Sequence, residues 1–272
     1  MATGCWLPTT KTPPSAALEG MDSLRVAPGG AADEAEVAPM TQTPLWLKKV
    51  QALEHHHGDV FRDFVRMAAC VCSCGEREDE YRRTVQRYPR AELETLCEAF
   101  GDVLGHKLRN PFDDIFGETY MARVSPTTRQ RLGEVYTPSA VAMLMARMSV
   151  HPPEPGRTLT VAEPACGSGI LVLGFAEALE GLGVSRLHLQ VQATDLNPLA
   201  ADMALINLGL AGIPAIVRHG NTLTNEVFHA HQTPAWRFAR PYSGEPQLEQ
   251  LSGGDLLTML RVTVPPPTRL AS

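Results

Sequence analysis

Residues 158–180 read TLTVAEPACGSGILVLGFAEALE, and this stretch decides the fold class. Its first part, Thr158 to Ala162, is β-prone and mostly apolar, which predicts a buried strand. A turn that contains Gly167 and Gly169 follows, and an apolar helix is predicted from Gly169 to about Glu180. Glycines at such a turn let the backbone bend sharply and let a ligand lie against it. The stretch therefore predicts a strand, a ligand-binding turn and a helix.

The same alternation continues downstream. Leu187 to Thr194 predicts a second strand, Asn197 and Pro198 predict the start of a helix, and Ala215 to Arg218 predicts a third strand. Strands that alternate with helices favour a parallel sheet with right-handed crossovers. One more strand or helix is expected at Leu256 to Val264, before a run of prolines.

Changes in composition divide the chain into four parts. We expect a disordered leader at residues 1–43, which are rich in Pro, Ala, Gly and Thr. Apolar residues at spacings of three and four predict a helical subdomain at 44–132. The ligand-binding α/β domain is expected at 133–240, followed by an irregular tail at 241–272.

Composition excludes several classes of protein. The chain has 272 residues, of which 44% are hydrophobic, so it can bury a substantial core. No apolar run is long enough to cross a bilayer, and six cysteines do not make a disulfide scaffold, so a cytoplasmic location is expected. A net charge of −6 argues mildly against tight binding of DNA by this chain alone. His55–His57 and Cys70–Cys74 lack the spacing of a structural zinc site, so no metal is expected.

A helix is also predicted just upstream of the first strand. Thr137 suits the N-cap position and Pro138 the first helical position. Four apolar residues then recur at helical spacing and form one apolar stripe: Val141, Leu144, Met145 and Met148.

Three successive loops suggest an adenosine-containing ligand. Ligands of such sheets bind at the carboxyl ends of the strands. There the sequence offers the glycine turn, Asp195, whose carboxylate can accept from both hydroxyls of a ribose, and the polar run Gly220-Asn221-Thr222. A nicotinamide cofactor is a distant alternative, because its fingerprint requires glycine where Val172 stands.

Three motifs in this order resemble the adenine-specific (amino) DNA methyltransferase family. Glu163 to Gly169 resembles the (D/N/E)PACGSG loop of that family, especially of the modification subunit of type I restriction systems. Gly133 to Pro138 resembles its G-x-F/Y-Y/F-T-P segment, and Asp114 to Tyr120 resembles the D-x-LG-x-x-Y run further upstream, with Phe116 in place of leucine.

The resemblance implies a Rossmann-like methyltransferase sheet that binds S-adenosylmethionine and acts on DNA. Only three strands are recognisable, against seven in the full methyltransferase sheet. The segment Tyr136, Thr137 and Pro138 would hold the methionine end of the cofactor. Asp195 would bind the ribose, with Leu196 beside the adenine and Asn221 at its edge. The floor under the cofactor would be formed by Glu163, Pro164, Ala165, Cys166, Gly167 and Gly169.

The catalytic motif of this family, (D/N/S)PP(Y/F), is missing. In the family its polar side chain and a proline carbonyl accept from the adenine amino group, and its aromatic ring stacks on the flipped base. The nearest positional match is Thr233-Pro234-Ala235-Trp236, in which Thr233 would accept a hydrogen bond and Trp236 would stack. The second proline is absent, and no clear apolar strand leads into Thr233.

Two functions therefore remain open. The first is methyl transfer to adenine in DNA as part of restriction-modification, with a specificity subunit or a second methyltransferase subunit as a possible partner. The second is a catalytically inactive cofactor-binding or partner-binding module of phage or plasmid origin. The cofactor loop favours the enzyme, and the missing catalytic motif favours the module.

Overall fold

The computed structural model of the protein describes residues 43–125, 127, 137–151, 153 and 158–238. These residues belong to one compact unit that begins at Thr43. Residues 1–42 of the expected leader, Tyr136 and the element expected at 256–264 lie outside the described residues.

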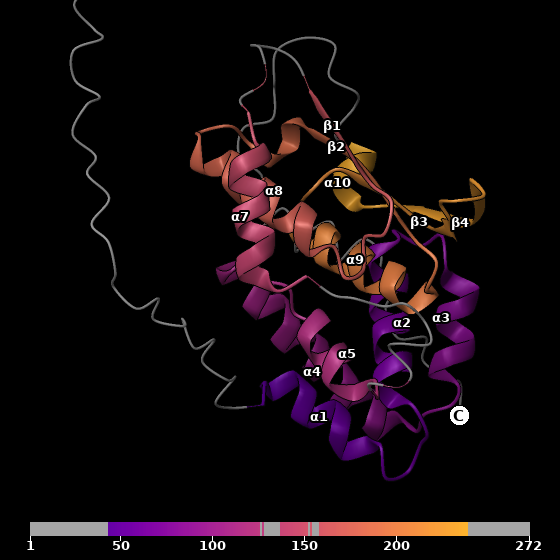
Figure 1. The fold of residues 1–272 in the computed structure, drawn as a ribbon. Coiled ribbons are helices and arrows are strands. Elements are labelled where there is room, and N and C mark those ends of the chain that lie inside the picture. Colours follow the sequence, from indigo (N-terminus) through magenta and orange to yellow (C-terminus); the bar gives the residue numbers. More distant parts are fainter. Residues whose placement is uncertain (1–42, 126, 128–136, 152, 154–157, 239–272) are drawn as a thin grey trace, which may run out of the picture. The chain divides into compact units, whose positions relative to one another are not determined.

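The described residues form a four-stranded sheet of order β1-β2-β3-β4 (Figure 1). β1 (Leu159–Glu163), β2 (Leu189–Asp195) and β3 (Ala215–Asn221) are parallel, and each lies close to its predicted position. β4 (Glu226–Gln232) pairs antiparallel with β3 and leads directly into Thr233. The strand that leads into Thr233 is thus not a clearly apolar one. β4 was not recognisable because most of its side chains are exposed and no apolar alternation marks it.

Two crossover helices complete the predicted alternation. α8 (Ile170–Gly181) follows β1, and α9 (Pro198–Leu210) follows β2, with the short helix η1 (Arg186–His188) in front of β2. Every residue of α9 from Leu199 to Leu210 is buried, because α9 packs on β2 and β3 on one side and on α2 on the other. A helix that is apolar all round is expected in such a position.

The segment upstream is helical, as its periodicity predicts. It contains α1 (Leu45–Leu53), α2 (Val60–Cys72), α3 (Glu78–Val85), α4 (Arg90–Arg109) and α5 (Gly117–Arg123). One hydrophobic cluster extends from Trp46 to Val217 and joins these helices to the sheet. The boundary between a helical subdomain at 44–132 and the α/β domain at 133–240 therefore stays a prediction.

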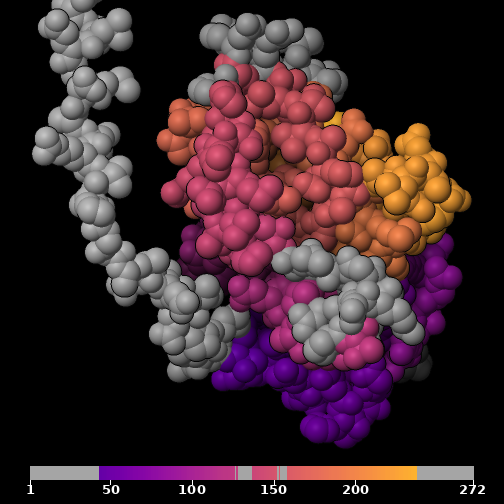
Figure 2. Space-filling view, in the orientation of Figure 1, coloured from indigo at the N-terminus to yellow at the C-terminus, as the bar shows by residue number. Residues whose placement is uncertain are grey.

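The helix α7 (Ser139–Ser149) differs slightly from its predicted start. It begins one residue later than expected, with Pro138 rather than Thr137 at the N-cap position. α7 lies at the surface of the molecule (Figure 2), and its large apolar side chains are exposed, with Met148 at 75%. The residues that it buries are Ala142 and Ala146, which pack closely on α8.

The close approach of α7 and α8 explains why the small residues of α7 are buried and its large apolar residues are exposed. A Cβ atom added at Gly174 of α8 would lie 3.4 Å from the carbonyl oxygen of Ala142 and 3.6 Å from Cβ of Ala146. Only small residues fit between helices at such a separation, so the small face of α7 turns inward. The apolar stripe of Val141, Leu144, Met145 and Met148 is thus exposed. No helix among the described residues combines the length and apolarity needed to cross a membrane.

Candidate functional site

The three predicted loops meet at the carboxyl edge of the parallel strands. The glycine loop at residues 164–169 follows β1, Asp195 ends β2, and Asn221 ends β3. These strands are neighbours in the sheet, so their carboxyl ends lie side by side. The fold therefore brings together residues that lie up to 58 positions apart, as the hydrogen bond from Thr222 Oγ1 to the carbonyl of Pro164 shows (2.7 Å).

The glycine loop has a defined backbone conformation. Gly167 and Gly169 have φ values of 54° and 92°, in the left-handed region that other residues rarely adopt. The amide of Gly169 donates to the carbonyl of Cys166 (2.8 Å), and the amide of Cys166 donates to the carbonyl of Thr194 (2.9 Å). Both glycines are thus required by the turn itself, and the loop is tied to the end of β2.

Asp195 connects the glycine loop to the helix that follows β2. Its Oδ2 accepts from the amide of Gly167 (2.8 Å), and its Oδ1 accepts from the amide of Asn197 (2.8 Å). Asn197 in turn caps α9 through the amide of Leu199 (3.0 Å). The carboxylate thus lies between the glycine loop and the start of α9, at the edge of the sheet where ligands of such folds bind.

Other members of the predicted cofactor floor support the loop or line its surface. Glu163 Oε1 accepts from the amide of Ala165 (3.3 Å). Cys166 is 5% exposed, and burial raises the pKa of its thiol well above the ordinary value. The thiol therefore stays protonated and packs as a small apolar group rather than acting as a nucleophile.

The two residues predicted to contact an adenine differ in their accessibility. Leu196 is 62% exposed directly beside Asp195, where it can contact a ligand. Asn221 uses its side-chain oxygen to accept from the amides of Leu223 (3.0 Å) and Thr224 (3.4 Å). It therefore holds the turn between β3 and β4, in addition to any contact with a base.

The third predicted segment is described only in part. Thr137 and Pro138 precede α7, and the carbonyl of Pro138 accepts from the amides of Val141 (2.9 Å) and Ala142 (3.0 Å). The glycine loop leads into α8, and α7 packs on α8. The segment with Thr137 and Pro138 and the glycine loop therefore belong to the same side of the sheet. Tyr136 lies outside the described residues.

One site residue was not assigned a role from the sequence. Asp114 accepts hydrogen bonds from Ser168 Oγ and from Asn207 Nδ2 (2.8 Å). It also accepts from the amides of Phe116 (3.1 Å) and Gly117 (3.0 Å) in its own turn. The carboxylate thereby links the segment before α5 to the glycine loop and to α9. The D-x-LG-x-x-Y resemblance was the available signal, but spacing alone does not reveal these partners.

The predicted catalytic residues Thr233, Pro234 and Trp236 do not join this site, which corrects that assignment. The amide of Thr233 donates to the carbonyl of Ala215 (2.9 Å), so Thr233 lies at the amino end of β3. The glycine loop and Asp195 are at the opposite edge of the sheet. β4 causes the separation, because an antiparallel strand returns the chain to the edge from which β3 started.

The Thr233 hydroxyl is also fully engaged in the fold. It donates to the carbonyl of Ile213 (2.8 Å) and accepts from the amide of Ala215 (3.0 Å). Thr233 has no solvent exposure, and α10 (Pro234–Phe238) starts directly after it. The threonine is therefore a structural residue that joins β4 to β3.

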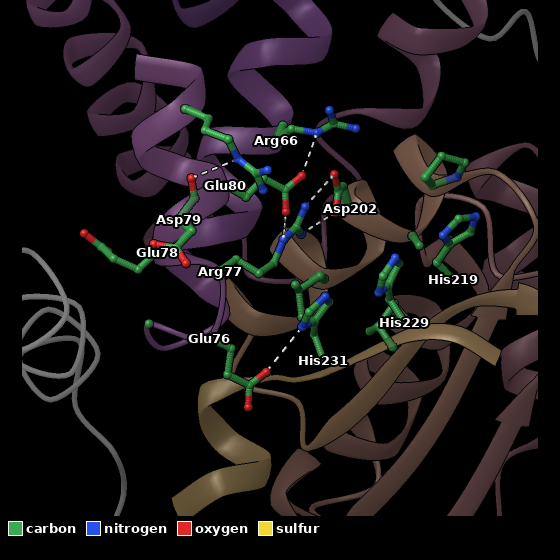
Figure 3. A pocket seen from close by; sticks show the side chains of 16 residues that line it. Arg66, Glu76, Arg77, Glu78, Asp79, Glu80, Asp202, His219, His229 and His231 are labelled. Carbon is green, nitrogen blue, oxygen red and sulfur yellow. Dashed lines mark hydrogen bonds and ion pairs between the residues drawn. The ribbon is translucent and has the colours of Figure 1, made fainter. Parts of the chain in front are cut away.

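A cavity of about 590 Å³ lies apart from the predicted site, between α3, α9 and the β3–β4 hairpin (Figure 3). One wall contains a buried ion pair between Arg77 and Asp202 (2.5 Å). The other presents three imidazoles, from His219, His229 and His231. No three side chains among the described residues are placed to hold a metal ion. None of the predicted cofactor-binding residues lines this cavity.

Comparison with known proteins gave one match. The sequence model of a family described as N-6 DNA methylase matches residues 110–245. No curated protein and no solved structure matched the chain. The matched range contains the Asp114 run, the glycine loop, Asp195 and Asn221, so it covers the whole site described above.

Proposed function

Because the chain belongs to the N-6 DNA methylase family, we propose that it binds S-adenosylmethionine at the carboxyl edge of β1, β2 and β3. We propose further that it transfers the methyl group to the exocyclic amino group of adenine in DNA. The observation that carries the proposal is the Asp195 carboxylate, which is fixed against the backbone of the glycine loop by the amide of Gly167.

The residues present suit such a cofactor. The glycine loop offers a backbone surface without side chains at two positions, where a ligand can lie in contact. Asp195 would accept from the ribose hydroxyls, and Leu196 would cover one face of the adenine. Thr137 and Pro138 would approach the methionine end. When bound, S-adenosylmethionine supplies the electrophilic methyl group.

The adenine amino group needs hydrogen-bond acceptors and a stacking surface for this reaction. The geometry described above does not assign these roles to Thr233 or Trp236, so they are not part of the proposal. DNA is the proposed substrate. A specificity subunit or a second methyltransferase subunit, as in type I systems, is a proposed partner that would provide the contacts to DNA.

A second candidate function is a cofactor-binding or partner-binding module without methyl transfer. It is favoured by one observation: the only TPAW run of the chain lies at the edge of the sheet opposite the glycine loop. Under this proposal the site binds S-adenosylmethionine, but DNA from cells that contain the protein carries no additional methyladenine.

Isothermal titration with S-adenosylmethionine tests the binding site. We expect wild-type protein to bind, and Asp195→Ala to bind at least about tenfold more weakly, because a charged acceptor is lost. Glu177→Ala is the matched control, since it removes an exposed carboxylate from α8, the helix that follows the loop. No binding by wild-type protein, or equal binding by both variants, would refute the proposed site. Binding of NAD instead would favour a dehydrogenase.

Mass spectrometry of DNA from expressing cells then separates the two functions. N6-methyladenine that depends on an intact Asp195 supports the enzyme. Cofactor binding without methyladenine, both alone and with a specificity subunit, supports the module.

A further inference from the structure

Asp114 contacts the glycine loop from its buried side. Its Oδ2 accepts from the hydroxyl of Ser168, which stands between the two left-handed glycines. Ser168 has no solvent exposure, so this contact is made inside the protein and away from any ligand on the loop surface. Asp114, which is half-buried, can therefore affect a bound cofactor through the loop.

A second contact fixes the same residue of the loop. Asn207 of α9 donates through Nδ2 both to Asp114 Oδ1 (2.8 Å) and to the carbonyl of Ser168 (3.0 Å). Asn207 is itself completely buried. The side chain and the carbonyl of Ser168 are thus both held, and this defines the orientation of the peptide groups next to Gly167 and Gly169.

The packing is close where Gly117 meets Asp114 and Ser168. A Cβ atom at Gly117 would overlap with Asp114 Oδ2 and would lie 2.7 Å from Ser168 Oγ. The loop segment before Asp114 is anchored as well, because the buried Lys107 donates to the carbonyls of Pro111 (2.9 Å) and Asp113 (2.6 Å). The carboxylate is therefore held in place independently of any ligand.

Holding the loop matters because of its glycines. Glycine has more conformational freedom in the absence of structure than any other residue, so an unsupported G-S-G run would sample many conformations. A ligand that binds only one of these conformations has its affinity reduced in proportion to the fraction of time that the loop spends in that conformation. Contacts that pre-organise the loop therefore increase the affinity for the ligand.

We propose that Asp114 is a positioning residue of the cofactor site, which keeps the glycine loop in its binding conformation through Ser168 and Asn207. This inference rests on the proposed function, because it assigns the loop to S-adenosylmethionine. It gives the D-x-LG-x-x-Y run a physical role: the run supplies the buried support of a loop that follows it by about fifty residues in sequence.

The first experiment needs no cofactor. Hydrogen exchange measures the opening of the loop through the amides of Gly167 and Gly169, which are hydrogen-bonded in the structure. Asp114→Ala should increase their exchange by about tenfold or more. Asp113→Ala is the matched control, since the neighbouring carboxylate is 58% exposed and pairs with His106. Equal exchange in Asp114→Ala and in wild-type protein would overturn the proposal.

The second experiment measures the affinity for S-adenosylmethionine by isothermal titration. Asp114→Ala should weaken binding by about tenfold to a hundredfold, and Ser168→Ala should weaken it in the same direction. Asp114→Asn should rescue most of the affinity, because its oxygen can accept from Asn207 and the turn amides, and its amide can donate to the oxygen of Ser168. The double variant Asp114→Ala/Ser168→Ala should lose less than the sum of both.

A purely structural role makes a different prediction. In that case Asp114→Ala lowers the free energy of unfolding but leaves the affinity of the folded protein unchanged, which would overturn the proposal. If Asp114→Ala does not fold, Ser168→Ala provides the same comparison. The two experiments can also disagree. If Asp114→Ala speeds the exchange of the loop but wild-type protein binds no S-adenosylmethionine, the proposed function is refuted, while the support of the loop by Asp114 is established.

Discussion

Replacing Thr233 with valine tests whether this threonine is a structural residue or a catalytic one. Valine keeps the shape of the side chain but removes the hydroxyl, which now donates to the carbonyl of Ile213 and accepts from the amide of Ala215. Thr233, Ile213 and Ala215 all have no solvent exposure, so water cannot replace the lost partner. The variant therefore leaves two buried polar groups of the backbone without this hydrogen bond.

The expected loss follows from these two groups. Each buried group that loses its partner costs about 1–3 kcal/mol, and the added methyl group offsets about 0.8 kcal/mol of the total. We expect the free energy of unfolding to fall by about 1–5 kcal/mol. In a protein of this size each kcal/mol lowers Tm by about 2–4 °C, so Tm should fall by about 2–20 °C.

Guanidinium unfolding followed by circular dichroism measures the loss of stability, and titration with S-adenosylmethionine measures the affinity of the cofactor site. Thr233→Val should be less stable than wild-type protein but should bind the cofactor with unchanged affinity. Thr233→Ser is the control, because it retains the hydroxyl. Wild-type stability of the valine variant together with a loss of DNA methylation would refute the reasoning and restore the catalytic role.

Three further predictions concern the core and the loop. Arg77→Met should reduce the free energy of unfolding by about 3–5 kcal/mol, because it leaves Asp202 buried without its partner. The double variant Arg77→Met/Asp202→Leu should lose clearly less in urea unfolding, and an equal loss would contradict this account. Burial lowers the pKa of Lys107 to about 7 from the ordinary 10.5, so between these pH values the unfolded chain holds a proton that the folded chain has released. Stability should therefore rise with pH across this window by up to about 1.4 kcal/mol per pH unit, and denaturation at several pH values should show that Lys107→Met lacks this component. Gly169→Ala should lower the free energy of unfolding by about 1–2 kcal/mol in the same assay, because φ is 92° at this position. Gly101→Ala on α4 is the control: the added Cβ has free space around it and should not destabilise the protein. Similar losses for both variants would show that the left-handed conformation is not the cause.

Local sequence patterns were sufficient for the parallel part of the sheet. The β1 strand, the glycine turn and α8 were predictable because their signals lie within a short stretch of the chain. The same is true of β2 and of α9, which Asn197 caps as expected. Asp195 was identified for a related reason, since a residue at the end of a parallel strand always faces the ligand edge.

Patterns were not sufficient where a contact with a distant segment decides the structure. The apolar stripe of α7 did not reveal which face of the helix is buried: the small Ala142 and Ala146 are buried because α8 approaches closely. β4 carries no strand signal, since it is stabilised by pairing with β3 and is exposed on most of its length.

The sequence by itself determined the order of the parallel strands and their helices, the glycine loop and the family to which the chain belongs, because these depend on residues that are neighbours along the chain. Only the tertiary structure decided which of the candidate residues meet. It placed Thr233 at the edge of the sheet opposite the glycine loop, because the antiparallel strand β4 reverses the direction of the chain. It brought Asp114 under the loop, because its half-buried carboxylate accepts hydrogen bonds from Ser168 and Asn207, which only folding brings close to it.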